Sequence, residues 1–514
     1  MSPCGSTNCS DAAVDGANTQ LPRSASSSGS IDETQGGNTD KSLISQTSTL
    51  KFDWCGHVPY TQFESQIRDL AHILWPASIV TETEKPFVER IRRRVTEAFG
   101  LKEPVSPPQS IRDSKEFVIE HLKGGSYNRV AAITTIEKDK PATQMVFRVP
   151  RGDWANPEHD ITILQFAKEH VKHIPIPEVF SYDLTSNNPL NSPYVLQKRI
   201  PGLDLESKTR SYPDLTHEQK LTFVEEFCQI LVDLKSVEHP YAGRIDTRIN
   251  DKGEKEFTVG PFPYEPESDE LIALRAAELQ FFKVRKYGEE ASSDYPPPDT
   301  TNDASDTKSR PKDQTPFHFL MTQFGRFKRQ SLMQRPHLIS EPYSLESRLV
   351  NMAIELNERD YLDSFEDEAH AFCLTHYNLD PCNIMVDIQD DGTLKITGIL
   401  DWDLAMFAPK WVHCRPPMWI WNWLDGGSED QSAADDTPPT EEQQELKELW
   451  EDLMGSSFII CAYRPEYRMA RILFRLALSG LRSPEDYESA RLLVDEWEEY
   501  CEDQKSEGGD EGEG

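Results

Sequence analysis

The sequence lacks the segments that mark membrane and secreted proteins. No apolar run reaches the roughly 18 residues that a membrane-spanning helix needs. The first residues are small and polar, unlike the charged and then apolar start of a secretory signal. The nine cysteines are scattered without a C-x-x-C pair, which indicates reduced thiols rather than a disulfide framework. We therefore expect a cytoplasmic protein with no membrane partner, and the sequence does not exclude the nucleus.

Basic residues are also scarce. The chain has 54 Lys and Arg against 88 Asp and Glu, which gives a formal net charge of -34. Nucleic-acid binding depends on neutralising phosphates with Lys and Arg, so we expect no nucleic-acid partner. A cationic small molecule is compatible with this charge, although a solvated acidic surface would account for it as well.

Composition divides the 514 residues into folded and unpacked stretches. Residues 1–48 are rich in Ser, Thr, Gly and Asn and are expected to be disordered. Residues 49–110 are expected to form a helical N-terminal extension. Polar runs predict disordered insertions near 289–316 and 426–440, and 504–514 is expected to be an acidic disordered tail. These unpacked segments could recruit protein partners.

Hydrophobic periodicity predicts two lobes. Residues 111–202 follow the order strand, glycine turn, strand, strand, helix, strand, and residues 203–503 are dominated by helical spacing. The expected strands and first helix are Phe117–Leu122, Arg129–Ile136, Gln144–Pro150, His159–His170 and Ser192–Arg199. The later helices are expected at Leu221–Leu234, Glu267–Phe282, Ser344–Asn357, Glu441–Leu453, Pro465–Leu478 and Pro484–Tyr500. The sequence thus predicts an α+β fold with a small antiparallel-sheet lobe and a larger helical lobe that carries insertions.

Two motifs in the second lobe indicate phosphoryl transfer. His376 and Asn383 fit the pattern H-x-D-x-x-x-x-N, and Asp401 follows a hydrophobic strand eighteen residues after Asn383. Such chemistry needs a clamp for the triphosphate, metal ligands and a group that orients the attacking hydroxyl. Asn383 and Asp401 offer the oxygen ligands that Mg²⁺ prefers, and Asp403 either reaches a second ion or caps the next turn. His376 is expected to support the loop structurally.

One position departs from the pattern, because Asn378 stands where the catalytic aspartate belongs. An asparagine can orient a hydroxyl, but it cannot take up a proton near neutral pH. Loss of a general base typically costs about 10² to 10⁴ in rate. Slow residual activity is still compatible with a loose transition state. Asp380, two residues further on, could stand in as the base or hold a cationic substrate group.

Three tryptophans alternate just after this region, at Trp419, Trp421 and Trp423. We expect them to pack in the core. The alternative is an aromatic wall for a cationic ligand.

The first lobe supplies candidates for phosphate binding. Gly124, Gly125 and Ser126, followed by Asn128, form a turn between two strands, where glycine lets backbone N–H groups approach phosphate oxygens. On the third strand, the guanidinium of Arg148 could hold phosphate oxygens bidentately.

The helix after that strand offers two acids as partners for Arg148. Asp160 is the expected partner, and Glu158 is the alternative.

Taken in chain order, these motifs resemble the aminoglycoside phosphotransferase-like family of small-molecule kinases, and most of all its fungal branch. The matching segments lie between about Glu116 and Trp423 and are Gly124–Asn128, Phe147–Arg151, Ile174–Pro177, Tyr194–Gly202 and Ile399–Asp403. The resemblance implies a protein-kinase-like bilobal fold, ATP and Mg²⁺ as cofactors, and nucleotide binding near Gln197 and Arg199. The chain departs from the family at Asn378, and at Arg148 and Asp160, where a lysine and a glutamate are usual.

Two functions fit this sequence. One is an ATP- and Mg²⁺-dependent phosphotransferase that acts on a hydroxyl of a small molecule. A cationic substrate would suit the negative charge of the chain, and Asn378 would impair the enzyme. The other is a pseudokinase that binds a nucleotide or a protein partner as a scaffold. A protein kinase is disfavoured, because D-F-G and A-P-E are missing and Trp402 takes the place of the phenylalanine.

Overall fold

The computed structural model describes most of the chain, in segments. The described residues are 58–75, 116–122, 124, 128–137, 141–152, 156–250, 252–262, 314–334, 345–362, 370–424, 429–481 and 484–508. The expectations for 1–48, for most of the 49–110 extension, for Glu267–Phe282 and for most of 289–316 therefore fall outside the described residues. Within the described parts, no helix is long and apolar enough to cross a membrane.

The small lobe is a five-stranded antiparallel sheet with one helix, as predicted. The strand order is β1-β2-β3-β5-β4. Its elements are β1 (Glu116–His121), β2 (Asn128–Ile136), β3 (Thr143–Pro150), α3 (Pro157–His170), β4 (Val179–Asp183) and β5 (Tyr194–Lys198). The predicted order of elements is confirmed, and β4 is the one strand that the sequence analysis did not include.

Strand pairing decides which small-lobe side chains face the rest of the molecule. Phe147 lies opposite Leu196, and Arg148 lies opposite Val195. Because successive side chains alternate between the two faces of a strand, Phe147 and Arg148 point in opposite directions. Phe147 enters a core on the outer face of the sheet, whereas Arg148 points to the face that carries α3.

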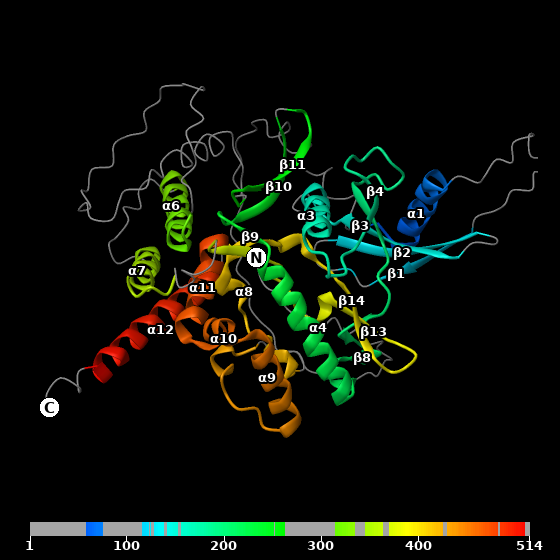
Figure 1. The fold of residues 1–514 in the computed structure, drawn as a ribbon. Helices are drawn as coiled ribbons and strands as arrows, with labels where there is room; N and C mark the ends of the chain where they lie inside the picture. The colour runs from blue at the N-terminus through cyan, green and yellow to red at the C-terminus, as the bar shows by residue number, and fades with distance from the viewer. Residues whose placement is uncertain are drawn as a thin grey trace, which may run out of the picture.

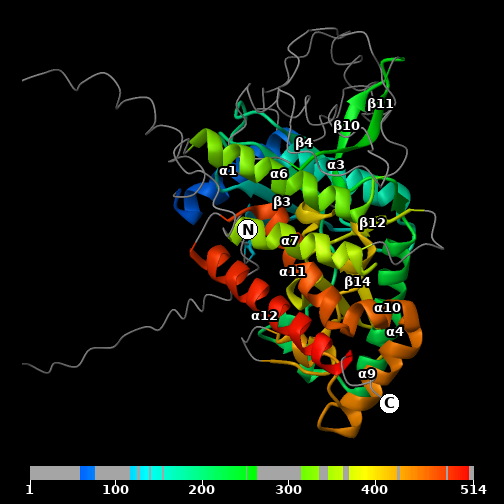
Figure 2. The ribbon, with the colours of Figure 1, turned by 90° about the vertical axis from the view of Figure 1, so that its left-hand side faces the viewer.

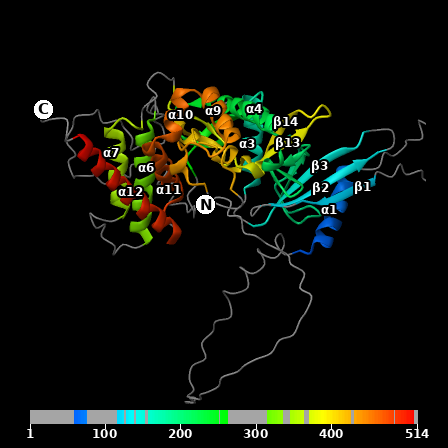
Figure 3. The ribbon, with the colours of Figure 1, turned by 90° about the horizontal axis from the view of Figure 1, so that it is seen from below.

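A helix from the N-terminal extension covers the outer face of this sheet. It is α1 (Tyr60–Leu74), and Figure 3 shows it along β1, β2 and β3. Its buried side chains pack into one cluster with the sheet; they are Phe63, Ile67, Leu70 and Ala71. Polar contacts add to the docking, since Arg68 Nη1 donates to the Phe117 carbonyl at 3.1 Å and Arg129 Nη1 donates to the Val58 carbonyl at 2.8 Å.

The large lobe is helix-rich, as predicted, and also contains strands, of which the sequence analysis expected the hydrophobic one before Asp401. A five-stranded sheet of order β11-β10-β15-β12-β9, a three-stranded sheet of order β14-β13-β6 and a two-stranded sheet of β7 and β8 lie beside the helices. The strands are β6 (Leu203–Asp204), β7 (Glu206–Ser207), β8 (Arg210–Ser211), β9 (Glu238–His239), β10 (Gly243–Ile249), β11 (Lys255–Gly260), β12 (Phe372–Thr375), β13 (Ile384–Ile388), β14 (Leu394–Ile399) and β15 (Met406–Pro409).

The helices of this lobe surround one large core (Figures 1 and 2). They are η2 (Tyr212–Asp214), α4 (His217–Lys235), α6 (Pro316–Gln334), α7 (Leu345–Glu358), η3 (Pro381–Asn383), η4 (Trp402–Leu404), α8 (Lys410–His413), η5 (Met418–Ile420), η6 (Gln431–Ala433), α9 (Glu441–Met454), α10 (Ser456–Tyr463), α11 (Pro465–Ser479) and α12 (Pro484–Gly508). A capping box between Thr216 and Gln219 starts α4, which satisfies backbone N–H groups of its first turn.

Two boundaries differ from the expectations. Residues 429–440, placed in a disordered insertion, are folded: Glu429 accepts from the Trp419 backbone N–H at 2.8 Å, and Ala434 is buried. Residues 504–508, expected in the disordered tail, belong to α12, which continues to Gly508. The polar composition of 429–440 gave no sign that this segment folds. In 504–508, the high helix propensity of Lys505 and Glu507 favours the extension of α12.

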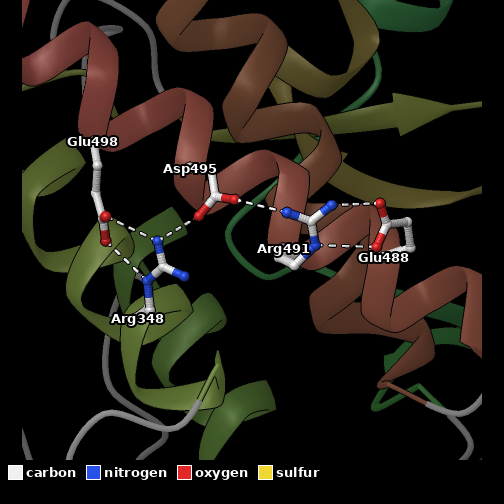
Figure 4. Close-up of polar contacts among 5 residues, drawn as sticks. All are labelled: Arg348, Glu488, Arg491, Asp495 and Glu498. Carbon is white, nitrogen blue, oxygen red and sulfur yellow. Dashed lines mark hydrogen bonds and ion pairs between the residues drawn. The ribbon is translucent and has the colours of Figure 1, made fainter.

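Figure 4 shows how the last helix is attached to α7. Arg348 of α7 pairs with Asp495 at 2.7 Å and with Glu498 at 2.8 Å, and Arg491 joins Asp495 to Glu488 within α12. Exposed pairs of this kind contribute little individually. Beneath them, the buried Trp497 donates to Glu355 at 2.9 Å, which fixes α12 on the same helix.

The docking of α1 yields a stability prediction. Ile67 of α1 is fully buried against the sheet, whereas Ile73 of the same helix is 64% exposed. Ile67→Ala leaves a cavity in the small-lobe core and is expected to lower the free energy of unfolding by about 2–5 kcal/mol. Ile73→Ala is the matched control and is expected to change it by under about 0.5 kcal/mol. Urea unfolding of the full chain measures both, and equal effects would show that α1 is not part of the core.

Candidate functional site

A β-hairpin brings together the two ends of the motif found in the sequence. Asn383 precedes β13 and Asp401 follows β14, and the strands pair with Ile384 opposite Ile399. The Leu400 backbone N–H donates to the Asn383 carbonyl at 2.8 Å, which closes the hairpin at this end. The seventeen residues between Asn383 and Asp401 therefore make up the hairpin, and its geometry places both side chains at one site.

Side-chain hydrogen bonds link the loop 376–383 to Asp401. The Asn378 amide nitrogen donates to Asp401 Oδ2 at 3.2 Å. The Asn383 amide nitrogen donates to the Asn378 carbonyl at 3.0 Å, which leaves the Asn383 amide oxygen as the atom able to bind a cation. The predicted trio of Asn378, Asn383 and Asp401 is thus assembled at one place.

Two residues at this site adopt left-handed backbone conformations. Tyr377 has a φ of 66° and Asp401 a φ of 61°. Such values cost energy in residues other than glycine and are concentrated at functional sites, where the surrounding structure enforces them. A sequence pattern gives no sign of this for Tyr377, since tyrosine is not a residue that favours the conformation.

Arg148 crosses from the small lobe to three carboxylates. Its guanidinium donates to Asp403 at 2.6 Å and lies 3.7 Å from Asp160 and 3.9 Å from Asp401. Asp160 comes from α3, whereas Asp401 and Asp403 come from the large lobe at η4. The Arg148 cluster is our name for these four residues. Glu158, the alternative partner of Arg148, is exposed.

The carboxylates of the Arg148 cluster are crowded. Burial, and then the nearby charge of Asp403, raise the pKa of Asp160, and Arg148 counteracts this only in part. The same two causes raise the pKa of Asp401, whereas Arg148 and the amide of Asn378 lower it. One guanidinium faces three carboxylates, so the cluster favours a further positive charge.

His376 lies beneath this arrangement. Its ring is fully buried and meets Trp402 edge to face, with ring centroids 4.8 Å apart. Burial lowers the pKa of His376 to about 4, although backbone groups of Leu400 and Asn378 favour the charged ring. The neutral ring fits the structural role predicted for it.

The small-lobe candidates are distributed more widely. Gly124 lies close to β2, because a Cβ there would approach the Asn128 carbonyl oxygen to 2.6 Å, while Gly125 and Ser126 fall outside the described residues. Gln197 is buried on the same face of the sheet as Arg148, and among the described residues its side-chain nitrogen has no hydrogen-bond partner. Arg199 pairs with Glu120 of β1 at 2.6 Å, so its guanidinium already has an acidic partner.

Asp380 is engaged by a residue that the sequence analysis missed. Arg415 lies 3.6 Å from Asp380 and 2.9 Å from Glu429, so it connects the loop to the segment after η5. No local sequence signal identifies Arg415, because the contact depends on how η5 and the loop meet in space. An arginine beside Asp380 competes with any cationic substrate group that the carboxylate was expected to hold.

The three tryptophans pack in or against the core. Trp419 and Trp421 are buried, and Trp421 lies 5.3 Å from Trp450 between ring centroids. Trp423 stacks on Tyr212 with centroids 5.8 Å apart. Packing in the core accounts for them without an aromatic wall.

The crowding of Asp160 gives a pH prediction. In the unfolded chain Asp160 loses its proton near pH 4, whereas the folded protein holds that proton to higher pH. The folded state then binds more protons, so this group destabilises the fold increasingly as pH rises above about 4. Relative to the wild type, Asp160→Asn is expected to gain up to about 1.4 kcal/mol per pH unit in that window.

Urea unfolding from pH 4.5 to 7 measures the difference between the two proteins. Asp390→Asn, at an exposed turn, controls for the loss of one negative charge. Parallel stability profiles for wild type and Asp160→Asn would contradict the raised pKa.

Comparisons with known proteins give partial likenesses. No family model matches the chain. Over 95 residues, 18% of either chain, it is 30% identical to a subtelomeric hrmA-associated cluster protein, in each of two strains of Aspergillus fumigatus. The chain thus spans less than a fifth of the length of these curated relatives, which does not assign it to a family.

Solved structures with a similar arrangement include two antibiotic phosphotransferases. One is spectinomycin phosphotransferase in complex with ADP and spectinomycin, 14% identical, with a TM-score of 0.30 and coverage of 73% of this chain and 91% of that one. The other is macrolide 2'-phosphotransferase from Brachybacterium faecium, 13% identical, with a TM-score of 0.32 and coverage of 74% and 94%. Both TM-scores are below 0.5, too low to transfer an activity to this chain.

Proposed function

We propose that this protein is a phosphotransferase of the aminoglycoside phosphotransferase-like type, which uses ATP and Mg²⁺ to phosphorylate a hydroxyl of a small molecule. The observation that supports it most is the Arg148 cluster, in which a cation from the small lobe meets Asp401 and Asp403 from the large lobe. The two lobes meet at this cluster, and acids of both converge there with Asn378 and Asn383.

The donor set fits a divalent cation. Asp401, Asp403 and the amide oxygen of Asn383 are hard oxygen ligands of the kind that Mg²⁺ prefers. Asp403 Oδ1 is buried and has no hydrogen-bond partner among the described residues, so a cation would satisfy it. No group of three or more His, Cys, Asp or Glu in the described chain could hold a metal ion, so the set proposed here depends on the amide oxygen of Asn383 beside the two carboxylates. When bound, Mg²⁺ would offset the negative charge of the phosphates.

The chain's own residues divide the remaining work. The guanidinium of Arg148 is a permanently charged fork suited to phosphate oxygens. The Asn378 amide can orient a hydroxyl but cannot remove its proton, so we expect slow turnover. Gln197 offers its buried, unpartnered amide nitrogen to a nucleotide on the face of the sheet that also carries Arg148.

A pseudokinase is the second candidate, and specific contacts favour it. Arg148 donates to Asp403 at 2.6 Å while it stays 3.7 Å from Asp160, so a candidate metal ligand already has a cationic partner. Asn378 likewise donates an N–H to Asp401. Both contacts stabilise the carboxylates without a metal. Such a protein would bind a nucleotide weakly or not at all and serve as a scaffold.

Removal of one charge at Asp401 separates these candidates. We expect the wild type to bind ATP only with Mg²⁺, and Asp401→Asn to weaken that binding at least roughly tenfold, the effect of a lost metal ligand or its support. Calorimetric titration of the purified full chain measures it, with Asp390→Asn as the control. Equal binding by Asp401→Asn and wild type would exclude this site, and no binding by folded wild type would favour the scaffold.

Restoration of the missing carboxylate tests the role of Asn378. Asn378→Asp would place a second carboxylate about where the amide now lies 3.2 Å from Asp401. Without metal, the two charges repel, so the melting temperature is expected to fall below that of the wild type. Added Mg²⁺ is expected to raise it more in Asn378→Asp than in the wild type, because a ligand stabilises the state it binds.

Turnover provides the second readout for this variant. With ATP and an accepted hydroxyl substrate, Asn378→Asp is expected to be faster by about 10² to 10⁴. Unchanged turnover combined with an unchanged response to Mg²⁺ would show that position 378 does not face the reacting groups.

A further inference from the structure

Two neighbouring side chains in the first turn of α3 point to different parts of the molecule. Asp160 points to Arg148, at 3.7 Å, and so belongs to the Arg148 cluster. Its neighbour His159 points to the large lobe, where its Nδ1 lies 3.9 Å from Asp246 Oδ1 on β10. The helix is started by Pro157 and by Asn156, whose side chain accepts from the His159 N–H at 3.2 Å. One short, well-capped turn therefore connects the site to a hairpin of the other lobe.

The receiving surface on the hairpin is itself fixed. Strands β10 and β11 pair in register from Arg244 opposite Gly260 to Ile249 opposite Lys255. Asp246 is held by Arg244 at 2.9 Å. Its carboxylate lies where a side chain at Gly260 would be, since a Cβ there would come within 2.5 Å of Asp246 Oδ2. Glycine at 260 thus makes room for the acid that faces α3.

Aromatic contacts extend the attachment along the helix. Phe166 of α3 meets Phe257 of β11 edge to face at 5.3 Å between centroids, and it meets Phe407 of β15 at 5.9 Å. His170 stacks on Phe166 at 4.1 Å and also contacts Phe257. Such pairs contribute beyond the area they bury. Phe257 is therefore the hairpin residue that joins the second half of α3 to the large-lobe core.

The other contacts of α3 show why its attachment to the β10–β11 hairpin affects the position of Asp160. The helix packs on η4, which carries Asp403, and on β4 and β5 of its own sheet. Figure 1 shows α3 between the sheet and the hairpin β10–β11. Residues 243–260 thus hold a small-lobe helix from the large-lobe side, at the point where that helix contributes an acid to the site.

We propose that the β10–β11 hairpin is a positioning device for α3, and that Phe257 is the positioning residue that keeps Asp160 against Arg148. The effect on nucleotide binding rests on the function proposed above; the effect on α3 does not. Loss of the hairpin contact lets α3 move away, so Arg148 is left with Asp403 and Asp401 and presents a different geometry to phosphate. The hairpin acts through Asp160 and touches no substrate.

The test combines hydrogen exchange with nucleotide titration on the full chain. In Phe257→Ala, amide exchange in 157–170 is expected to become faster, while that in β1, β2 and β3 stays unchanged. The affinity for ATP with Mg²⁺ is expected to fall roughly 5-fold or more, the lower range of coupling between sites. In an Asp160→Asn background, Phe257→Ala is expected to cause no further loss, since the two changes act on one contact.

Ile249→Ala is the matched control, because Ile249 lies on β10 and is 68% exposed. Should Phe257→Ala fail to fold, Phe257→Leu keeps an apolar side chain and gives the same readouts in milder form. Unchanged exchange in 157–170 would overturn the proposal, and so would faster exchange with unchanged or additive nucleotide affinity. If exchange in α3 rises but folded wild type binds no nucleotide, the positioning role stands and the proposed phosphotransferase function fails.

Discussion

The contact on which the site depends is the ion pair between Arg148 and Asp403, which joins the two lobes. Arg148 belongs to a strand whose alternate side chains form the outer core with α1, and Asp403 belongs to the turn after the β13–β14 hairpin. The outer face of the small-lobe sheet forms its own hydrophobic cluster with α1, whereas α3 of the small lobe packs into the large-lobe core. Arg148 adds a charged contact between the lobes at the site. Asp160 and Asp401 also lie within 4 Å of Arg148. The chemistry available to the protein depends on how the positive charge of Arg148 balances these three carboxylates.

Charge balance also explains why the site can be described in two ways. A guanidinium among three carboxylates leaves negative charge that a divalent cation would compensate. Yet Arg148 already forms a directional, charge-assisted contact with Asp403, and Asn378 satisfies Asp401 with an N–H. These contacts stabilise the cluster through the protein's own groups. The protein is thus expected to be folded and ordered at this site whether or not a nucleotide is present.

The sequence predicted the elements whose signals are local. The order of the small lobe, the convergence of Asn383 with Asp401, and the choice of Asp160 as an acid near Arg148 all follow from strand patterns and motif spacing. It could not predict contacts made only in space, such as Arg415 with Asp380. The β10–β11 hairpin was missed because each strand has only two large apolar side chains among charged and polar ones, Ile245 and Ile249 in β10 and Phe257 and Val259 in β11. The left-handed conformation of Tyr377 has no signature in a residue of that type.

The most direct test of the account is a crystal structure of the protein with Mn²⁺ and a non-hydrolysable ATP analogue. We predict an anomalous peak at coordination distance, about 2.0 to 2.4 Å, from Asp401 and from the amide oxygen of Asn383. Arg148 is predicted to turn from Asp403 toward the phosphates while Asp160 keeps its place. A structure in which the analogue and the ion are absent from this cluster, with the contact between Arg148 and Asp403 unchanged, would contradict the account.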